Sequence, residues 1–516
     1  MEIDPRIGAL FRFTCVNGLL QAFVFEDWSL ILVGTATWHL LVWAWLETST
    51  RSARVAGVTW VRLAMMVPFL GYPCYWISRM PHTWESDLWS VQTDLVMALW
   101  LLLYGAAENT DSLSETLHEM FAGFYAAAGL WKFNSDFLDP KASCASVFFS
   151  QHVTYFCSML PWESQLGLAE SVLPFVPLGG VGVELAMALT LALGRLDRRF
   201  ARLGLLFILY FHLWVCITPR PNNISLFAVQ CASRLVIVVD PLQLEATGRK
   251  LRGHVIALSV VAALAVAYGV QAAFEPLNWS FLAYGFLFLF LHWAMVMEKG
   301  EKGAAAQAPA KKVCRRPRWS FLATCFAWTY AFGVIMLGLM EEASCNMFAN
   351  LKIHGGSNHL VLPTGLLFKW FREAGDAHPY GGGVVRMETT DSHWLQSIYP
   401  CDMTHVLTPH AAPELLEQLG IPRPSFLNSG ANRILRLRER GIIPPPPHDL
   451  LLQYTTPALE WKRLLKEAME KDRSFAVTYA HLPGVAGDEM WRATAYERRV
   501  QLKALCGRMA PRNLRL

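Results

Sequence analysis

Several ionisable side chains occur within or at the end of long apolar stretches of this chain, notably Lys132, Glu184, His212 and Arg234. A charged side chain in hydrocarbon costs about 2.5–3.5 kcal/mol on insertion scales, so such residues usually belong to a functional site or to a buried pair. We therefore take these four residues as the first candidates for chemistry.

Glu184, His212 and Arg234 are expected at similar depths in the membrane. Helical rise places Glu184 about 15 Å, His212 about 14 Å and Arg234 about 12 Å from the ends of their predicted helices that lie on the same side of the membrane. We expect an acid–base network at this level, with Glu184 and His212 as catalytic candidates and Arg234 as a substrate-binding candidate. The alternative is a network that only holds helices together.

Lys132 ends an apolar segment rich in small residues, which favour close approach of neighbouring helices. A lysine in a tight, desolvated cleft loses its proton more easily and becomes a usable base. The alternative is an ordinary lysine that extends from the helix end to the interface. We predict Lys132 as a catalytic base, with the adjacent Trp131 and the nearby Asn134 in contact with the substrate.

Several common enzyme classes lack their motifs here. The sequence contains no Walker A loop, no HExxH, no GxSxG and no zinc-type cysteine spacing. We therefore expect no metal site. A net charge of +4 without a basic block that carries interleaved aromatics also gives no reason to expect nucleic acid as a partner.

Composition and hydropathy indicate a polytopic α-helical membrane protein. Hydrophobic residues make up 53% and charged residues only 17% of the chain, against about 25% charged in soluble domains. We predict about 10–11 transmembrane helices, one of them the weaker segment 9–25. The other predicted spans are 30–47, 57–78, 88–106, 115–131, 168–194, 203–219, 223–241, 254–274, 279–298 and 319–340.

Loop charge predicts the orientation of these spans. One set of loops carries sixteen Lys and Arg residues, whereas the opposite set carries four. The positive-inside rule assigns the first set to the cytosol. We therefore expect a multi-pass protein of an endoplasmic reticulum-type membrane, or of the plasma membrane, with its C-terminal part on the non-cytosolic side.

Residues 1–298 thus form the main transmembrane domain, 299–318 a basic cytosolic linker, and 319–340 the last span. Beyond them we predict a lumenal domain of mixed α+β structure at 341–516. Within that domain, β-like pieces are expected at 347–353, 383–388, 392–399 and 403–408, a helix after Thr456-Pro457, and a second helix at 487–505.

Three cysteines of the predicted lumenal domain, Cys345, Cys401 and Cys506, could form a disulfide in an oxidising compartment, but the sequence does not choose the pair. His354 and His359 lie in a Gly-rich run, HGGSNHL, just beyond the last span. These two histidines either cap the cavity and contact the substrate, or belong to an ordinary turn.

Three segments resemble the HTTM superfamily, which includes the vitamin K-dependent gamma-glutamyl carboxylases. They are LFRFTCVNGLL (10–20), FAGFYAAAGLWKFNSDFLD (121–139) and LLFILYFHLWVCITPRPNNISLFA (205–228). The resemblance covers roughly residues 9–240. It implies a multispan helical core with a lumenal C-terminal domain, which agrees with the topology that loop charge predicts.

The resemblance also implies a chemistry. In the carboxylases a lysine acts as base on a reduced quinone, whose oxidation by dioxygen generates the strong base that removes a glutamate γ-proton before CO₂ adds. Lys132 occupies the matching position and His212 matches the membrane histidine. The resemblance therefore implies an enzyme with a lipophilic substrate, with reduced vitamin K or another quinone as cofactor, and with membrane lipid as a further partner.

Two other functions fit the residues. Acid and base groups in an aromatic cavity would also suit an isoprenoid cyclase or isomerase, because aromatic faces stabilise carbocations. A transporter for lipids or small molecules, or a membrane scaffold without catalysis, would use the same helices to enclose a polar set.

Overall fold

The structure is a computed structural model, and it is mostly helical. It describes residues 3–24, 29–48, 59–78, 85–105, 109–140, 143–157, 160–194, 196–216, 225–239, 244–245, 247, 276–296, 317–336, 345, 349, 351, 359–362, 384–392, 395, 456–471, 474–482 and 496–503. The predicted linker 299–318 and the predicted span 254–274 lie almost wholly outside these residues.

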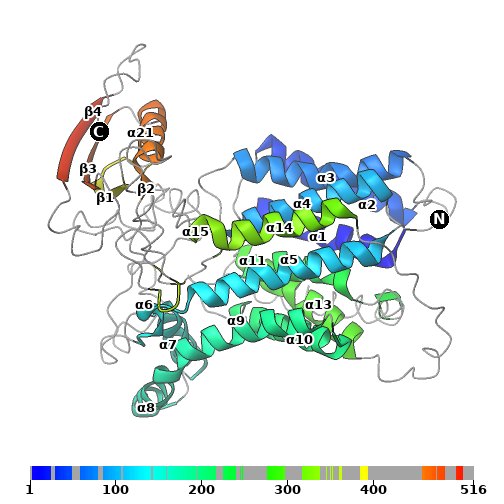
Figure 1. The fold of residues 1–516 in the computed structure, drawn as a ribbon, viewed down its shortest axis with the longest axis horizontal. Coiled ribbons are helices and arrows are strands. Elements are labelled where there is room, and N and C mark those ends of the chain that lie inside the picture. Colours follow the sequence, from blue (N-terminus) through cyan, green and yellow to red (C-terminus); the bar gives the residue numbers. More distant parts are fainter. Residues whose placement is uncertain are drawn as a thin grey trace, which may run out of the picture.

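Five long helices form the N-terminal part of the bundle, and all five were predicted (Figure 1). They are α1 (Pro5–Val24), α2 (Leu30–Thr48), α3 (Thr59–Ser78), α4 (Glu85–Tyr104) and α5 (Thr110–Trp131). The weaker segment 9–25 is thus a helix. α3 packs along both α2 and α4.

The next predicted helix, 168–194, is broken in the structure. A short helix α6 (Ser135–Leu138) and the helices α7 (Cys144–Phe156) and α8 (Trp162–Val172) lead to a 3₁₀ turn, η1 (Leu173–Phe175), and only then to α9 (Val176–Leu193). Pro174 and Pro177 explain the break, because each lacks a backbone N–H and clashes with the preceding turn of an α-helix. The predicted span 168–194 is thus present within the helical stretch Trp162–Leu193, which contains a 3₁₀ turn that the sequence analysis did not predict.

The rest of the bundle follows the predicted spans. It consists of α10 (Arg198–Cys216), α11 (Ser225–Leu235) with the 3₁₀ turn η2 (Val236–Val238), α13 (Pro276–Val296), and α14 (Arg318–Trp328). A π-helical segment, η5 (Thr329–Gly333), joins α14 to α15 (Val334–Met336).

Among the described residues, four helical stretches are long and apolar enough to cross a membrane. They are Leu30–Thr48, Trp162–Leu193, Arg199–Cys216 and Arg318–Met336. Large hydrophobic side chains on these stretches face outward, among them Trp45, Leu189, Trp214 and Phe326. The fold is therefore compatible with an integral membrane protein whose spans are α-helices.

α5, α9 and α10 run side by side and position the candidate site (Figure 1). Gly129 of α5 faces α9 so closely that a Cβ there would meet Leu185 at 2.9 Å from its side chain and 3.0 Å from its backbone nitrogen. Gly123 of the same helix gives similar room to Trp328 of α14. The small residues of α5 thus allow the close approach that the sequence predicted.

The described residues of the C-terminal domain form an antiparallel sheet with one helix. Its strand order is β2 (Thr456–Pro457), β1 (Val384–Thr390), β3 (Ser474–Leu482), β4 (Tyr496–Lys503). α21 (Ala458–Lys471) packs on the sheet, and its buried Trp461 contacts Tyr479 with ring centroids 5.3 Å apart.

Two predictions for this domain are confirmed and one is wrong. The strand near 383–388 and the helix after Thr456-Pro457 are present. The helix predicted at 487–505 is wrong over Tyr496–Lys503, which is strand β4. Tyr496, Val500 and Leu502 follow a period of two, and the strand pairs antiparallel with every residue of β3 except its last, Leu482, from the edge of the sheet.

Candidate functional site

A buried ion pair joins Lys132 to Glu184. Nζ of Lys132 lies 2.9 Å from Oε1 and 2.8 Å from Oε2 of Glu184, and both side chains are only 7% exposed. Lys132 follows the last residue of α5, and Glu184 lies in the first half of α9. The close backbone approach at Gly129 brings these two positions within reach of each other.

Both members of this pair line an apolar cavity of about 580 Å³ between α5, α7, α9 and α10. This volume lies within the usual range for small-molecule sites, about 300–1,000 Å³. Besides Lys132 and Glu184, the polar groups in the wall are the hydroxyls of Tyr125 and Tyr210 and the indole of Trp214. The remaining lining residues are Phe124, Ala128, Phe137, Ala145, Phe148, Phe149, Val172, Val176, Gly179, Gly180, Val183, Phe207, Phe211, Val215 and Phe227.

His212 lies behind this wall and reaches the cavity through Tyr125. The Tyr125 hydroxyl and Nε2 of the fully buried His212 are hydrogen-bonded at 2.7 Å. Phe211 and Phe227 contact the imidazole edge-on, and Nδ1 has no hydrogen-bond partner within the described part of the chain. His212 can therefore orient the Tyr125 hydroxyl as a buried hydrogen-bond partner.

Asn134 shapes the end of the cavity. Its Oδ1 accepts the backbone N–H of Phe137 at 2.8 Å and so caps α6, while Nδ2 donates to the carbonyls of Trp131 and Ala349. The cap places the Phe137 ring against Lys132, with Nζ 5.9 Å from the ring centroid. Asn134 is completely buried and is not part of the cavity wall.

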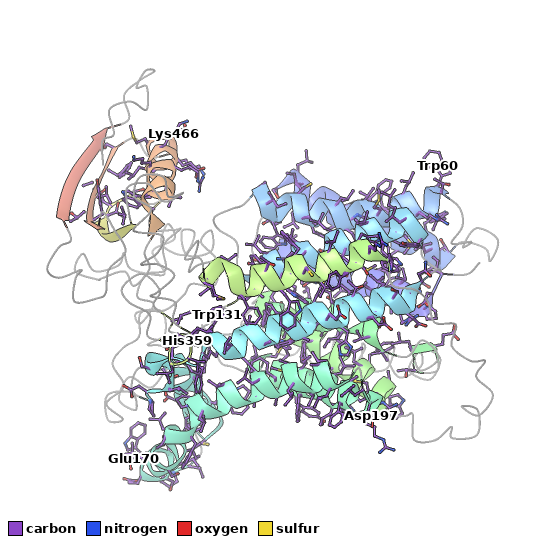
Figure 2. All side chains as sticks on the ribbon, in the orientation of Figure 1. Trp60, Trp131, Glu170, Asp197, His359 and Lys466 are labelled. Atoms are coloured by element: carbon purple, nitrogen blue, oxygen red, sulfur yellow. The ribbon has the colours of Figure 1, made fainter. Side chains whose placement is uncertain are left out.

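Trp131 points away from the cavity, toward η5. Its indole N–H donates to the carbonyl of Ala331 at 3.0 Å, inside the π-helical segment, and its ring contacts Phe332 and His359. The end of α5 is thus fixed from the side opposite to the cavity. Figure 2 shows Trp131 and His359 together at this end of the long helices, whereas Trp60 and Asp197 lie at the other end.

His359 also holds the end of α5. Its Nδ1 accepts the N–H groups of Val361 and Leu362, so Nε2 carries the proton and donates to the carbonyl of Leu130 at 2.8 Å. Burial lowers the pKa of His359 below its ordinary value, although the bond to Leu130 opposes this shift. Both ring nitrogens are thus engaged within the protein. His354 lies outside the described residues.

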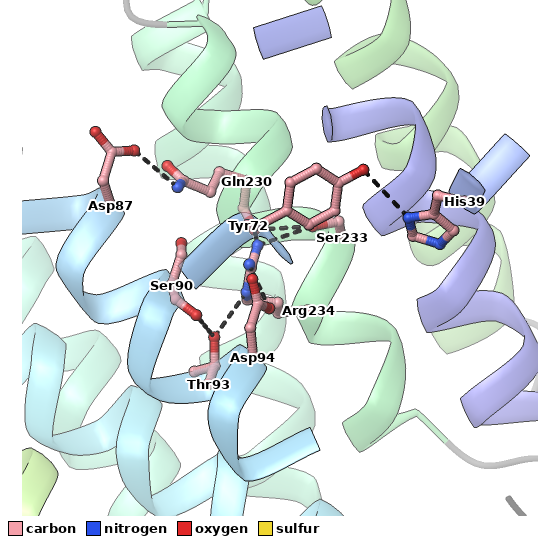
Figure 3. Close-up of polar contacts among 9 residues, drawn as sticks. All are labelled: His39, Tyr72, Asp87, Ser90, Thr93, Asp94, Gln230, Ser233 and Arg234. Carbon is pink, nitrogen blue, oxygen red and sulfur yellow. Dashed lines mark hydrogen bonds and ion pairs between the residues drawn. The ribbon is translucent and has the colours of Figure 1, made fainter. Parts of the chain in front are cut away.

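Arg234 belongs to a second buried cluster, apart from Lys132 and Glu184 (Figure 3). Its guanidinium contacts Oδ1 of Asp94 at 2.7 Å and the Thr93 hydroxyl at 2.8 Å. The expected network of Glu184, His212 and Arg234 is therefore wrong as a set of contacts. Helical rise predicted a depth for each residue, but it did not give the direction in which each side chain points.

Further polar residues surround the Asp94–Arg234 pair. Gln230 donates to Asp87 at 3.0 Å, and the Tyr72 hydroxyl is hydrogen-bonded to Nδ1 of His39 at 3.2 Å (Figure 3). These side chains come from α2, α3, α4 and α11, so the cluster ties four helices together. None of them lines the cavity.

Sequence reasoning missed Tyr125 and Phe137 as parts of the site. Tyr125 precedes Lys132 by seven residues, which places both on one face of α5 two turns apart. That spacing would have indicated Tyr125 once Lys132 was chosen. Phe137 carried no such indication, because its position depends on the turn that Asn134 caps. Among the described residues, no cluster of His, Cys, Asp or Glu could hold a metal ion.

Comparison with known proteins adds one match. A family described as "Domain of unknown function (DUF8388)" matches residues 357–507, which lie within the predicted C-terminal domain. Neither the curated proteins nor the solved structures give a match to this chain. Cys345 is buried, and Cys401 and Cys506 lie outside the described residues, so their pairing stays a prediction.

Proposed function

We propose that this protein is a membrane-embedded enzyme that binds a lipophilic small molecule in the cavity between α5, α7, α9 and α10. The observation that carries the proposal is the Lys132–Glu184 ion pair in the wall of an otherwise apolar cavity. A buried ion pair is a poor way to gain stability, because desolvation offsets most of its attraction. An ion pair in the wall of an apolar cavity is therefore better explained by a ligand that needs it.

The geometry supports proton transfer as the chemistry. A proton that moves from Nζ of Lys132 to the Glu184 carboxylate, 2.8 Å away, leaves a neutral amine in the cavity wall. Such an amine accepts a proton from an acidic hydroxyl of the bound molecule. The Tyr125 hydroxyl, supported by His212, supplies a second polar contact on the same face of α5.

A reduced quinone such as vitamin K hydroquinone suits these residues. It combines an aromatic ring, hydroxyl groups and a hydrocarbon chain, and the cavity offers apolar walls with polar groups near Lys132 and Tyr125. When bound, a reduced quinone supplies two electrons for reaction with dioxygen. Lys132 and Glu184 would hold and deprotonate its hydroxyl, and the phenylalanines of the wall would exclude water. Glutamate carboxylation in particular rests on the resemblance to the HTTM superfamily.

The proposal includes the full predicted topology. We propose 10–11 spans, an endoplasmic reticulum-type membrane, and a lumenal α+β domain at the C-terminus. The cavity lies toward the ends of α5 and α10 and the start of α9, which is the non-cytosolic end in this topology. A substrate would then meet the site from the lumenal half of the bilayer.

A second candidate function is an isoprenoid cyclase or isomerase. The observation that favours it is the aromatic lining of the cavity, in which Phe124, Phe148, Phe149, Phe207 and Phe211 accompany the ion pair. Aromatic faces stabilise cations by about 0.5–2 kcal/mol each. This reaction would need neither dioxygen nor bicarbonate, which separates it from carboxylation by experiment.

The test is an assay of purified full-length protein in lipid nanodiscs, with reduced vitamin K, dioxygen, labelled bicarbonate and a glutamate-containing peptide. Formation of quinone epoxide and fixed label in the wild type, with loss of both in Lys132→Met, would support carboxylase-type chemistry. Epoxide without fixed label would restrict the function to quinol oxidation. Neither product from folded protein would overturn the carboxylase proposal, and saturable flux of a lipophile without any product would favour a transporter.

A further inference from the structure

The cavity opens through the surface that α9 and α10 present to their surroundings. On α9 its wall consists of Val176, Gly179, Gly180, Val183 and Glu184, a stripe with the helical spacing of three and four residues. Gly179 and Val183 are exposed on the outside of the bundle, whereas Glu184 is buried. The part of the cavity wall that α9 forms thus extends from the outer surface of the bundle to the Lys132–Glu184 ion pair.

α10 forms the other side of this opening. Phe207, Tyr210 and Trp214 follow one face of α10, and they are 38%, 50% and 48% exposed although they line the cavity. α9 and α10 both belong to the four stretches that are apolar and long enough to cross a membrane. Their outer surface therefore faces hydrocarbon in a bilayer, and so does the opening between them.

Two glycines keep the opening clear. A Cβ at Gly179 would meet nothing within 4 Å, and a Cβ at Gly180 would meet only the Phe137 ring, at 3.5 Å. Side chains at these positions would extend into the space between α9 and the aromatic residues of α10. We name the space bounded by Gly179, Gly180, Val183, Tyr210 and Trp214 the lateral slot.

We infer that the lateral slot admits the hydrocarbon chain of an isoprenoid amphiphile directly from the bilayer, and that this chain stays in the slot while its polar end meets Lys132 and Glu184. The inference rests on the proposed function and specifies its substrate class. The ion pair and Tyr125 lie on the inner wall, whereas the slot is mainly aliphatic and aromatic and its Tyr210 hydroxyl is already hydrogen-bonded to His292, so the polar end of an amphiphile is best satisfied at the ion pair.

The slot favours one chain with a small polar end. A phospholipid would bring a zwitterionic head into an apolar cavity that offers only a single ion pair and two tyrosine hydroxyls, and its desolvation would be costly. An alcohol or phenol at the end of an isoprenoid chain requires far less compensation. The aromatic side chains of α7 and α10 also suit the flat, branched units of an isoprenoid.

The experiment is photolabelling of full-length protein reconstituted in phosphatidylcholine vesicles. The probe is a farnesol analogue that carries a diazirine on its chain, and diazirine analogues of palmitic acid and of phosphatidylcholine serve as comparison. In the wild type we expect the farnesol analogue to label peptides from α9 and α10. Gly179→Leu/Gly180→Leu fills the slot and should reduce this labelling by about tenfold, since the leucine side chains occupy the space that the hydrocarbon chain needs.

Gly182→Leu is the matched control. Gly182 lies on the same helix, a Cβ there also meets nothing within 4 Å, and the residue does not line the cavity. This variant should label as the wild type does. A single Gly179→Leu variant, whose side chain enters open space, replaces the double variant if the latter does not elute as folded protein.

Lys132→Met separates this inference from the proposed function. It should lose turnover, while the folded fraction should keep the labelling of α9 and α10 peptides, because the slot holds the hydrocarbon chain. If Gly179→Leu/Gly180→Leu or Gly179→Leu is labelled as strongly as the wild type, the slot is not a substrate entrance. The same holds if only the phosphatidylcholine analogue labels the protein. Neither result would contradict the proposed role of Lys132. Slot labelling in a wild type that turns over no substrate would overturn the enzymatic proposal and leave the slot in place.

Discussion

At the scale of single residues, the Lys132–Glu184 pair is the feature on which the account depends. The sequence predicted both residues as candidates, because charge in an apolar segment is costly. It did not predict that they meet, since α5 and α9 are separated in the chain by α6, α7, α8 and η1. Depth along a helix follows from residue count, but the rotation of each helix follows from packing with neighbours distant in sequence.

Removal of one partner from this pair should destabilise the protein strongly. Glu184→Gln or Lys132→Met leaves the other group buried with an uncompensated charge, at a cost of about 3–5 kcal/mol. The double variant Lys132→Met/Glu184→Gln should be more stable than either single variant, because no charge is then stranded. The unfolding temperatures of the wild type, the two single variants and the double variant in detergent measure these differences in stability.

The exposed pair Arg12–Glu47 supplies the control for this comparison, since both of its side chains are nearly half exposed. Glu47→Gln should change stability by less than about 1 kcal/mol. Additive effects of the two single changes at Lys132 and Glu184 would contradict a direct ion pair.

At the scale of elements, close helix packing decides where the site forms. The small residues of α5 were visible in the sequence, and their consequence, a close approach to α9, is present in the structure. The break between α8 and α9 was missed although Pro174 and Pro177 indicate it, because a long apolar stretch was given more weight. The strand β4 was missed because its period of two is short and carries several charges.

Gly129→Ala tests the packing of α5 on α9. A Cβ at this position would lie 3.0 Å from the backbone nitrogen of Leu185, so the helices must move apart, at a cost of about 1–3 kcal/mol. The movement also lengthens the contact between Lys132 and Glu184, so turnover should fall together with the unfolding temperature.

Gly182→Ala on α9 is the control for Gly129→Ala. It enters open space and should be neutral or stabilising by up to about 1 kcal/mol, because alanine favours a helix over glycine. Equal stability of the two variants would show that α5 and α9 do not approach as closely as the structure has them.

At the scale of the whole molecule, two further sets of contacts hold the parts together. The Asp94–Arg234 cluster joins α4 to α11, and the segment that contains His359 docks on the end of α5. Of these residues, Arg234 and His359 were predicted from the sequence as candidates for the site. Their actual contacts depend on helices and loops that come together only in the folded chain.

Asp94→Asn separates the second cluster from the site. The change leaves Arg234 without its anionic partner and should lower the free energy of unfolding by about 3–5 kcal/mol. Because the cluster does not line the cavity, the affinity of the folded fraction for a lipophilic ligand should stay unchanged. A large loss of affinity at full stability would instead place Arg234 in the binding site.

His359 gives the protein a pH-dependent contribution to stability. Its pKa is lowered in the folded state, so the folded protein binds fewer protons than the unfolded chain. The contribution is therefore fully present above a pH of about 6.5 and is lost as the pH falls below it. The unfolding temperature of the wild type should fall between neutral and mildly acidic pH more steeply than that of His359→Gln, and identical pH profiles would contradict this role.

The central claim is that the cavity binds a lipophilic molecule with its polar end at Lys132 and Glu184. Cryo-electron microscopy of the full-length protein in nanodiscs with a reduced isoprenoid quinone tests it most directly. We expect density that fills the cavity, with an oxygen atom of the quinone within hydrogen-bond distance of Nζ of Lys132 and its isoprenoid chain between α9 and α10. A closed, empty cavity with the quinone bound elsewhere would contradict it.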